Sequence, residues 1–420
     1  MNDRIKIDPA VVEGMILDMA RHGSDGGTGV SRTVYSPEWV KATQLYARWC
    51  EEAGLSSRMD TAGNVWGRLE GRETGAKAIV SGSHIDTQTP GGRYDGTLGL
   101  IAALVAISAL KEQFGEPRLP LECVALCEEE GSRFPSANFW GSRAITGRIA
   151  DQDLQATIGY DGGTIAEAMR EVGLDPSQIG EAQRADIGAF VELHIEQGPI
   201  LEQADLPVAV VTGITGIRHY QVELKGTANH AGAFPMDLRR DPMAGFAEIA
   251  TGVIDTAHRW GRPAVTTIGR IAALPNGAAI IPESVRFSLD ARHPDPDLCQ
   301  ALYASHERLM REVAARRNLE IDWTITLDHP AWPSAPAIVE TLKTAAKAQG
   351  VPVMTMASGA GHDSQQMARI APTAMIFVRS KDGRSHTPEE FSSIADIVAG
   401  IEVLAAGLYR LAYTDSSPAS

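Results

Sequence analysis

The arrangement of hydrophobic and polar positions divides the chain into stretches of different character. In about the first two hundred residues, apolar positions at helical spacing alternate with short apolar runs that are typical of strands. These patterns predict helices over residues 11–21, 37–53 and 98–111, and strands over residues 65–69, 78–82, 119–127 and 190–195. The helix over 37–53 has clear boundary signals, with Ser36 as its cap, Pro37 in its first position and Gly54 after it. Strand and helix in alternation predict an α/β layer with a covered sheet.

From residue 213 the pattern is that of a smaller α+β unit. Residues 284–293 alternate strictly, so that Val285, Phe287, Leu289 and Ala291 face one side of a strand and the polar residues between them face the other. We expect further strands over residues 218–225, 265–271 and 320–327, and helices over 241–260 and 295–315. Together these elements predict a compact sheet with helices on one face.

After residue 330 the first pattern returns, with a helix predicted over 337–348 and strands over 351–356 and 374–378. The simplest interpretation is an α/β, mixed-sheet domain of residues 1–212 and 331–420, interrupted by an inserted α+β domain of residues 213–330. We expect the tail after Tyr413 to be disordered.

Composition narrows the function classes. The 420 residues are 44% hydrophobic and 22% charged, which is typical of a globular protein, and the formal net charge of −15 disfavours nucleic acid and anionic membranes as partners. The N-terminus lacks the apolar core of a signal peptide, and the apolar run over residues 98–110 is shorter than a membrane span. The spacing of the four cysteines fits neither a disulfide framework nor a zinc ribbon, so we expect reduced thiols and a cytoplasmic protein.

Candidate chemistry gathers where the predicted strands end. His84 and Asp86 follow one strand, Asp95 precedes a helix, Glu128–Glu130 follow a buried strand, and His194 ends another. His386 lies in a loop rich in Gly, Ser and Pro. Imidazole and carboxylate groups of this kind are the ligands of Zn²⁺, Mn²⁺ or Co²⁺, with one carboxylate left over as a general base.

Each of these residues also has an ordinary interpretation. Asp95 alone fits a helix cap, the glutamate triplet fits a solvated turn, and His194 alone fits a structural histidine. All of them together require a coincidence at five strand or loop ends. Asp86 is placed to accept the second ring proton of His84 and so to fix its tautomer.

Six motifs occur in a characteristic order: Gly-Ser-His84-Ile-Asp86, Asp95-Gly96, Glu129-Glu130-Gly131, His194-Ile-Glu-Gln-Gly-Pro, Asn229-His230-Ala-Gly and Ser-His386-Thr-Pro. In this the chain resembles the dinuclear-metal amidase family of N-carbamoyl-L-amino-acid hydrolase, β-ureidopropionase and allantoate amidohydrolase, relatives of the aminoacylase and carboxypeptidase-G metallopeptidases. The resemblance runs from about Gly29 to Phe391. It implies a metallopeptidase-like catalytic domain and an insertion that serves as lid and dimerisation domain.

The resemblance also implies roles for the candidate residues. One metal would be held by His84, Asp95 and His194, and the other by Asp95, Glu130 and His386. Glu129 would act as the base, and Glu128 has no role in the family pattern, so we expect it to face solvent.

The substrate would contact a second group of residues. By the resemblance, Asn276 and Arg292 hold a substrate carboxylate, and His230 stabilises the oxyanion from the partner subunit of a homodimer. The remaining pocket residues would be Gln197, His219, Ala360 and His362. The ordinary interpretations are a turn for Asn276, a solvent-exposed side chain for Arg292 and a loop histidine for His230.

These inferences predict a hydrolase that cleaves the carbamoyl C–N bond of N-carbamoyl-L-amino acids. The alternatives are hydrolysis of allantoate, a ureidoglycolate or another N-acyl amino acid, a metallo-aminopeptidase, and an inactive binding homologue. Ile217 stands where many members of the family have glutamine, and Phe234 stands where small hydroxyl residues are common. Both indicate a less polar pocket, which weakens the case for allantoate.

Overall fold

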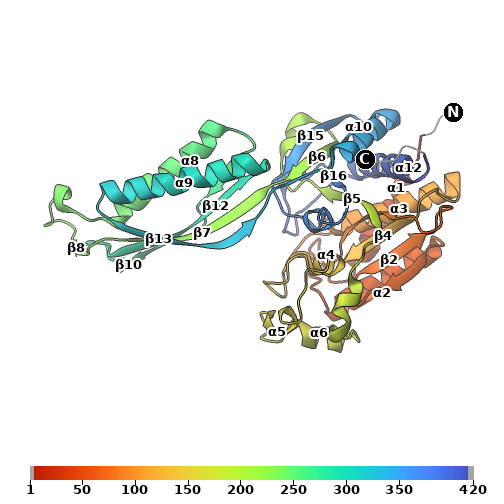
Figure 1. The fold of residues 1–420 in the computed structure, drawn as a ribbon, viewed down its shortest axis with the longest axis horizontal. Coiled ribbons are helices and arrows are strands. Elements are labelled where there is room, and N and C mark those ends of the chain that lie inside the picture. The colour runs from red at the N-terminus through yellow and green to blue at the C-terminus, as the bar shows by residue number, and fades with distance from the viewer. Residues whose placement is uncertain (1–3, 415–420) are drawn as a thin grey trace. The chain divides into compact units, whose positions relative to one another are not determined.

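The computed structural model describes residues 4–414, and the tail expected to be disordered lies mostly outside them. Within that range the chain forms two compact units. The first unit comprises the chain up to Thr212, then Ser334–Met356 and the chain from Gly361 onward; the second unit comprises Gly213–Pro333 and Ala357–Ala360. Figure 1 shows the helices and strands of each unit.

The first unit is built on a mixed sheet. Its strands are β1 (Ser56–Met59), β2 (Val65–Leu69), β3 (Ala78–His84), β4 (Leu121–Leu126), β5 (Ile187–Ile195), β6 (Val208–Ile214), β15 (Val353–Ser358) and β16 (Thr373–Val378). They run in the order β1-β2-β4-β3-β5-β16-β6, with β15 beside β6. The central strands β4, β3, β5 and β16 are parallel, whereas β1, β2 and β6 pair antiparallel. Parallel strands end at the same edge, which brings the candidate residues at their carboxyl ends together.

Helices cover both faces of this sheet (Figure 1). The larger helices are α1 (Pro9–Ala20), α2 (Pro37–Glu52), α3 (Thr97–Phe114), α10 (Pro336–Gln349) and α12 (Ile394–Ala412), which share one apolar core. A smaller core on the other face includes α4 (Trp140–Ile145) and α11 (Ser364–Met367). Strand β3 shows why both are needed, since Ile79 packs into the first core and Ala78 and Val80 into the second.

Helix α3 is the apolar stretch that we expect to be buried. Among the described residues it is the one helix long and apolar enough, by length and composition, to cross a membrane, and 61% of it is buried inside the protein. Its residues contribute to the larger core of the first unit. The four cysteines are free and buried, and Cys50 Sγ lies 3.8 Å from Cys123 Sγ.

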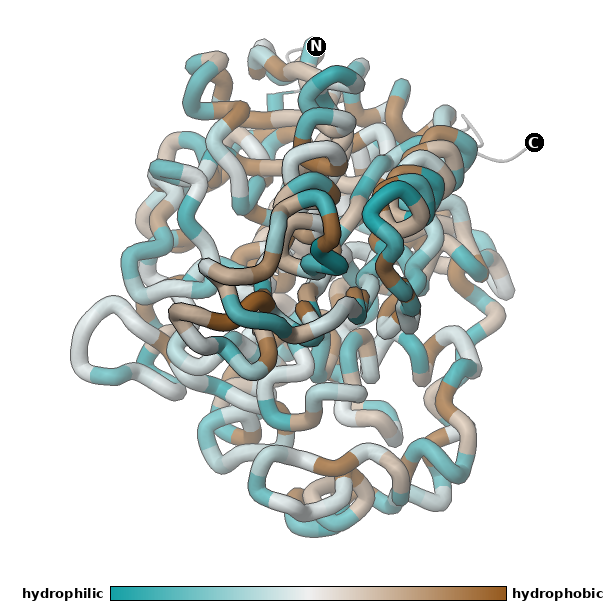
Figure 2. The backbone as a smooth tube through the Cα atoms, turned by 90° about the vertical axis from the view of Figure 1, so that its left-hand side faces the viewer, coloured by the Kyte–Doolittle hydropathy of each residue, from teal (hydrophilic) through white to brown (hydrophobic). Residues whose placement is uncertain are grey.

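The second unit is an antiparallel sheet with helices on one face. Strands β10 (Ile271–Leu274), β12 (Ser284–His293), β7 (Gly216–Lys225) and β13 (Glu320–His329) lie side by side, with β9 (Val265–Thr267) against β12. Helices α8 (Pro242–Trp260) and α9 (Pro296–Arg316) pack on the face that carries Val285, Phe287 and Leu289. Teal and brown bands alternate along the tube of the helices, as amphipathic helices require (Figure 2). The polar residues of β12 are therefore left on the opposite face.

Short elements complete the two units. In the first unit they are α5 (Asp153–Ala156), α6 (Ile165–Glu171), α7 (Ile200–Ala204), η1 (Pro176–Ala182) and η3 (Lys381–Gly383). In the second unit they are β8 (Asn229–His230), β11 (Ile280–Ile281), β14 (Trp332–Pro333) and η2 (Met236–Leu238).

Most of the expected elements are present within a few residues of their predicted bounds. The single strand expected over residues 265–271 is wrong, because β9 and β10 are separate and both pair with β12. Helix α12 was not expected, although Ser393 has a cap signal and its side chain accepts a hydrogen bond from the Asp396 N–H.

Candidate metal centre

The candidate ligands lie at the carboxyl edge of the first unit's sheet. His84 is the last residue of β3, and His194 is the last but one of β5, its parallel neighbour. Glu129 and Glu130 follow β4 on the other side of β3. The mixed α/β topology therefore brings together side chains that are far apart in the sequence.

Asp95 lies at the centre of the cluster, and its two carboxylate oxygens face different side chains. Oδ1 is 3.5 Å from His84 Nε2 and 3.1 Å from His194 Nε2. Oδ2 is 3.3 Å from His386 Nε2, which is also 3.3 Å from Glu130 Oε1. Asp95 thus belongs to two groups of potential ligands, one with both buried histidines and one with Glu130 and His386. Two groups of potential ligands that share one aspartate could hold two metal ions side by side.

The hydrogen bonds of the two buried histidines test whether a cation fits. Nδ1 of His84 is 3.0 Å from the Asp86 carbonyl oxygen, and Nδ1 of His194 is 2.9 Å from the Ile195 carbonyl oxygen. Each Nδ1 therefore donates its proton to a carbonyl, so a neutral ring directs the lone pair of Nε2 at Asp95. Two acceptors that face each other repel unless a proton or a cation lies between them, so the donor set fits divalent cations. Nitrogen and oxygen ligands of this kind suit Zn²⁺, Mn²⁺ and Co²⁺ alike.

Electrostatics in the cluster agree with this interpretation. Burial alone would raise the pKa of Asp95, but the three neighbouring imidazole groups of His194, His386 and His84 hold that pKa well below 3.8. Burial raises the pKa of Glu129 well above 4.5; His84 opposes the shift and Glu130 adds to it. Glu130 Oε1 is buried without a hydrogen-bond partner among the described residues. A site with this many carboxylates requires positive charge to remain ionised.

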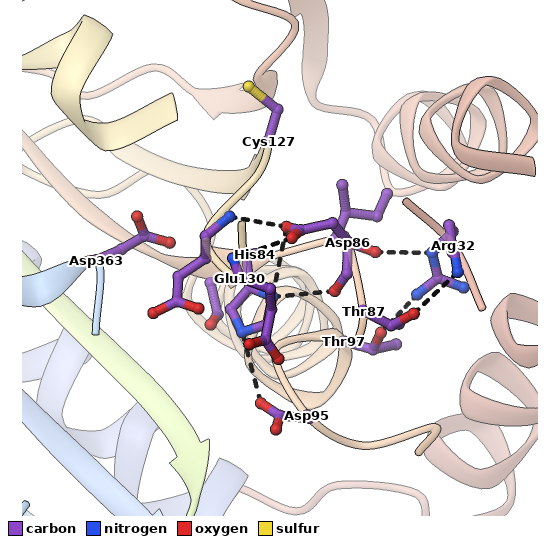
Figure 3. A network of polar contacts seen from close by, with 12 residues as sticks. Arg32, His84, Asp86, Thr87, Asp95, Thr97, Cys127, Glu130 and Asp363 are labelled. Carbon is purple, nitrogen blue, oxygen red and sulfur yellow. Dashed lines mark hydrogen bonds and ion pairs between the residues drawn. The ribbon is translucent and has the colours of Figure 1, made fainter. Parts of the chain in front are cut away.

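Asp86 supports the cluster in a different way from the one expected. Its carbonyl oxygen, not its carboxylate, receives the ring proton of His84, because the nearest carboxylate oxygen is 3.6 Å from Nδ1. The carboxylate instead accepts the N–H groups of Glu129, at 3.0 Å, and Glu130, at 3.1 Å (Figure 3). Asp86 therefore fixes the loop after β4 as well as the ring of His84.

The expectation that Glu128 faces solvent is wrong. Its side chain is fully buried, and burial together with nearby Asp86 raises its pKa well above 4.5. The backbone of Glu128 has a φ of 46°, in the left-handed region. The three consecutive glutamates are thus not a solvated turn.

The helix-cap interpretation of Asp95 is also excluded. The cap position of α3 is Gly96, and no side chain caps that helix. The Asp95 carboxylate instead accepts from Gln197 Nε2 at 2.9 Å and from Ser385 Oγ at 2.6 Å. Gly96 is required here, since its φ is 62° and a Cβ atom on it would lie 2.3 Å from His84 Nδ1.

Glu390 supports the candidate site and was missed by the sequence analysis. Its Oε1 accepts the N–H groups of Tyr94 at 2.8 Å and Asp95 at 2.9 Å, and its Oε2 accepts from Ser385 Oγ at 3.1 Å. It therefore ties the loop of the bridging aspartate to the loop of His386. The one sequence feature that could have indicated Glu390 is its position four residues after His386.

Two expected substrate residues of the first unit lie beside the cluster. Gln197 Nε2 donates to Asp95 and lies 3.5 Å from His386 Nε2. The ring of His362 is buried, 4.6 Å from that of His194, and burial lowers its pKa well below 6.5. The next residue, Asp363, accepts from Ser142 Oγ at 2.5 Å, and burial raises its pKa to about 8.

The second unit holds the expected carboxylate-binding residues on the polar face of its sheet. Asp290 is directly opposite His219 on β7 and accepts from His219 Nε2 at 2.9 Å. Arg292 donates from Nε and Nη2 to the two oxygens of Asp290, at 2.9 and 2.8 Å, and from Nη1 to the Gly359 carbonyl at 2.8 Å. Although burial opposes it, hydrogen bonds from His219 and Arg292 lower the pKa of Asp290 to about 2. Arg292 is therefore held in place by hydrogen bonds rather than free in solvent. Ala360, the other expected pocket residue here, directly follows Gly359, whose carbonyl accepts from Arg292.

His230 and Asn276 lie elsewhere in the second unit. His230 is exposed on β8, and its Nδ1 accepts the N–H groups of Gly232 and Ala233, both at 3.1 Å. The proton of the neutral ring is therefore on Nε2, which is free to donate to a substrate oxygen. Asn276 has a φ of 62°, as its turn interpretation predicts. That the two residues act on the metal-bound substrate stays a prediction.

Comparisons with known proteins agree with this geometry. The chain matches peptidase family M20/M25/M40 over residues 80–410. It is 39% identical to allantoate amidohydrolase of Escherichia coli strain K12, over 96% of this chain and 98% of that protein. It is 37% identical to N-carbamoyl-L-amino-acid amidohydrolase of Paenarthrobacter aurescens, over 94% of this chain and 95% of that protein. A hydantoinase/carbamoylase family amidase from Burkholderia ambifaria superimposes with a TM-score of 0.89 at 32% identity, over 98% of this chain and 100% of that chain.

Fold and site together define a metal-dependent hydrolase with a mixed α/β sheet. The chain belongs to peptidase family M20/M25/M40, whose enzymes depend on two metal ions. Within it the chain is an amidohydrolase of the allantoate and N-carbamoyl-amino-acid group, which acts on C–N amide bonds. The resemblance inferred from the motifs is confirmed.

Proposed function

We propose that this chain hydrolyses N-carbamoyl-L-amino acids to the free amino acid, CO₂ and ammonia. The observation that carries the proposal is the double cluster around Asp95, with Glu129 beside it and not part of either ligand set that shares Asp95. A carbamoyl carbonyl is a poor electrophile, because a nitrogen on each side donates electrons into it. Two divalent cations, when bound, supply Lewis acidity toward that carbonyl and lower the pKa of water.

The protein's own residues then move the protons. Glu129 takes a proton from the attacking water, whose oxygen bonds to the carbamoyl carbon, and returns it to the leaving nitrogen as the C–N bond breaks. His230, with its proton on Nε2, donates to the developing oxyanion. The carbamic acid that is released decomposes to CO₂ and ammonia.

Arg292 is suited to the substrate carboxylate. Its described hydrogen bonds use three of its five N–H groups and leave one on Nη1 and one on Nη2. A pair of parallel donors is what a carboxylate binds in bidentate fashion. Asp290 fixes the plane of the guanidinium, so little entropy is lost when the substrate binds.

Ile217 is the residue that favours an N-carbamoyl amino acid over allantoate as the substrate. It pairs directly with Arg292 across β7 and β12, and residues opposite each other share a face of the sheet. An apolar neighbour of the carboxylate site favours a substrate with an apolar side chain. It offers no hydrogen bond to the second ureido group of allantoate.

Allantoate remains the second candidate, because the identity of 39% to the Escherichia coli allantoate amidohydrolase is slightly higher than the 37% to the carbamoylase of Paenarthrobacter aurescens. Hydrolysis of a ureidoglycolate or of another N-acyl amino acid uses the same chemistry. The small anionic substrate, the cytoplasmic location and the homodimer in which His230 serves the partner's site stay predictions.

The test is a substrate panel with the enzyme reconstituted separately with Zn²⁺, Mn²⁺ and Co²⁺. N-carbamoyl-L-amino acids should yield amino acid and ammonia in equal amounts, with the apolar side chains preferred. A higher kcat/KM on allantoate would replace the proposal with the second candidate. Turnover of N-acyl amino acids or dipeptides without ammonia would indicate an acylase or an aminopeptidase. No turnover of any compound by metal-loaded protein would indicate a binding homologue.

A further inference from the structure

Arg32 is a buried cation that the catalytic scheme does not use. Its side chain is 1% exposed, and it bonds only to neutral oxygens. Nε donates to the Ile85 carbonyl at 2.7 Å, Nη1 to the carbonyls of Met19 and His22 at 3.1 and 2.9 Å, and Nη2 to Thr97 Oγ1 at 2.7 Å. A buried charge is normally paired with an opposite charge, so an arginine without a bonded carboxylate needs a reason.

The electrostatic surroundings explain how the charge is tolerated. Met19 and His22 lie at the C-terminal end of α1, where the last carbonyl groups of a helix carry partial negative charge. Among the acids around Arg32, Asp86 favours the charged form most, ahead of Glu38. Burial lowers the pKa of Arg32 to about 10, which leaves it protonated at neutral pH. The guanidinium is therefore held as a charged fork between α1 and the metal-binding loops.

The partners of Arg32 are segments that carry metal ligands. Ile85 lies directly after His84, and Thr97 lies two residues after Asp95. The backbone of Arg32 adds two hydrogen bonds to the same connection. The Arg32 N–H donates to Thr87 Oγ1 at 2.9 Å, and the Thr87 N–H donates to the Arg32 carbonyl at 3.0 Å. Both ends of the connection between β3 and α3 are thus fixed to one residue.

Residues 85–87 in turn orient the rest of the cluster. Figure 3 shows Arg32 on one side of Asp86, with His84 and Glu130 on the other. The Asp86 carbonyl accepts the ring proton of His84, and its carboxylate accepts the N–H groups of Glu129 and Glu130. A shift of this loop would therefore move a ligand of each metal and the general base together.

We propose that Arg32 is a positioning residue of the metal centre, which holds the β3–α3 connection so that His84 and Asp95 reach ligating geometry. The shape of the guanidinium is needed as well as its charge. Four acceptors on three separate segments suit a planar fork of five donors, and the single ammonium of a lysine cannot satisfy them all. The proposal rests on the metal centre but not on the identity of the substrate.

The experiment compares Arg32→Lys, Arg32→Met and Thr97→Val with the wild-type chain. Thr97→Val removes one acceptor of Arg32 with little change in volume. The control is Arg184→Met, since Arg184 is also largely buried and pairs with Glu122 near the start of β4, at the opposite end from Glu129. The measurements are the Kd values and stoichiometry of Zn²⁺ by calorimetry, the visible spectrum of the Co²⁺ form, and the melting temperature of the metal-free protein.

We expect Arg32→Met to weaken metal binding by about 10- to 100-fold and to change the Co²⁺ spectrum, as is usual when residues that orient ligands are lost. Arg32→Lys should fall between Arg32→Met and the wild type, Thr97→Val should show a smaller loss, and Arg184→Met should lower only the melting temperature. Wild-type Kd values and spectra in folded Arg32→Met would overturn the proposal. Full recovery in Arg32→Lys would show that charge alone suffices and would also overturn it. A wild-type chain that binds no metal would instead contradict the proposed function.

Discussion

The candidate metal centre of the first unit and the polar sheet face of the second unit hold their proposed functional side chains differently. In the first unit, His84, His194 and Asp95 are buried, and each has a further hydrogen bond that fixes its orientation. In the second unit, Arg292 and His219 are only partly buried and are held mainly around Asp290. The difference agrees with the proposed roles, because metal ligands must be placed to within about half an ångström, whereas groups that bind a carboxylate can remain hydrated until the substrate arrives.

The largest expected effect separates chemistry from metal binding in the first unit. Glu129→Gln removes the proton acceptor but keeps the size of the side chain and the backbone N–H that Asp86 holds. We expect kcat to fall by about 10²- to 10⁴-fold with two metal ions still bound, measured by turnover and by metal analysis of the same sample. Glu122→Gln, at the start of the same strand β4, serves as the control. Turnover like that of the wild type would remove Glu129 from its role.

In the second unit, the matched substitution should act on binding rather than on chemistry. Arg292→Lys keeps the charge but loses the paired donors, and we expect KM to rise by about 30-fold, or about 2 kcal/mol, with little change in kcat. Arg286→Lys is the control, because Arg286 lies on the same face of β12 and pairs with Glu223. Equal effects of the two substitutions would show that the polar face acts only through its net charge.

Glu390 tests whether indirect support matters in the first unit. Glu390→Gln keeps one oxygen for the N–H groups of Tyr94 and Asp95 but loses the acceptor for Ser385. We expect metal affinity to fall by about tenfold, which competition with a chromophoric chelator measures. Glu389→Gln, at the neighbouring exposed position, is the control. Unchanged affinity would mean that the two loops hold each other without Glu390.

The sequence could predict the local parts of both regions. Capping residues and alternation set the bounds of α2, β2 and β12, and the patterns placed His84 and His194 at strand ends and Asp95 just before a helix. Interactions between segments that are distant in the sequence could not be predicted in this way. Glu128 looked like one more exposed acid until the turn after β4 buried it, and the contacts of Glu390 and Arg32 join residues separated by hundreds and by tens of positions. Such partners follow from the order of strands in the sheet, which periodicity does not contain.

The smallest expected effect concerns the stability of the second unit. His306 on α9 is fully buried, its Nε2 is 2.9 Å from Thr266 Oγ1, and burial lowers its pKa from 6.5 to about 4. Below pH 6.5 the unfolded chain binds a proton at this histidine that the folded chain does not. The contribution of His306 to the free energy of unfolding therefore decreases as the pH falls from about 6.5 to about 4. Above pH 7 this contribution is nearly constant. Between pH 8 and pH 6 the loss is about 0.8 kcal/mol.

Hydrogen exchange of α9, corrected for the intrinsic effect of pH, measures that loss in the full chain. Protection in the wild type should fall by about fourfold between pH 8 and pH 6, and His306→Gln should remove this difference. Protection of α3 in the first unit is the internal reference, since it contains no histidine. If α9 in the variant still loses the same protection, the pH response belongs to groups other than His306. The stability of the second unit would then not depend on keeping His306 neutral.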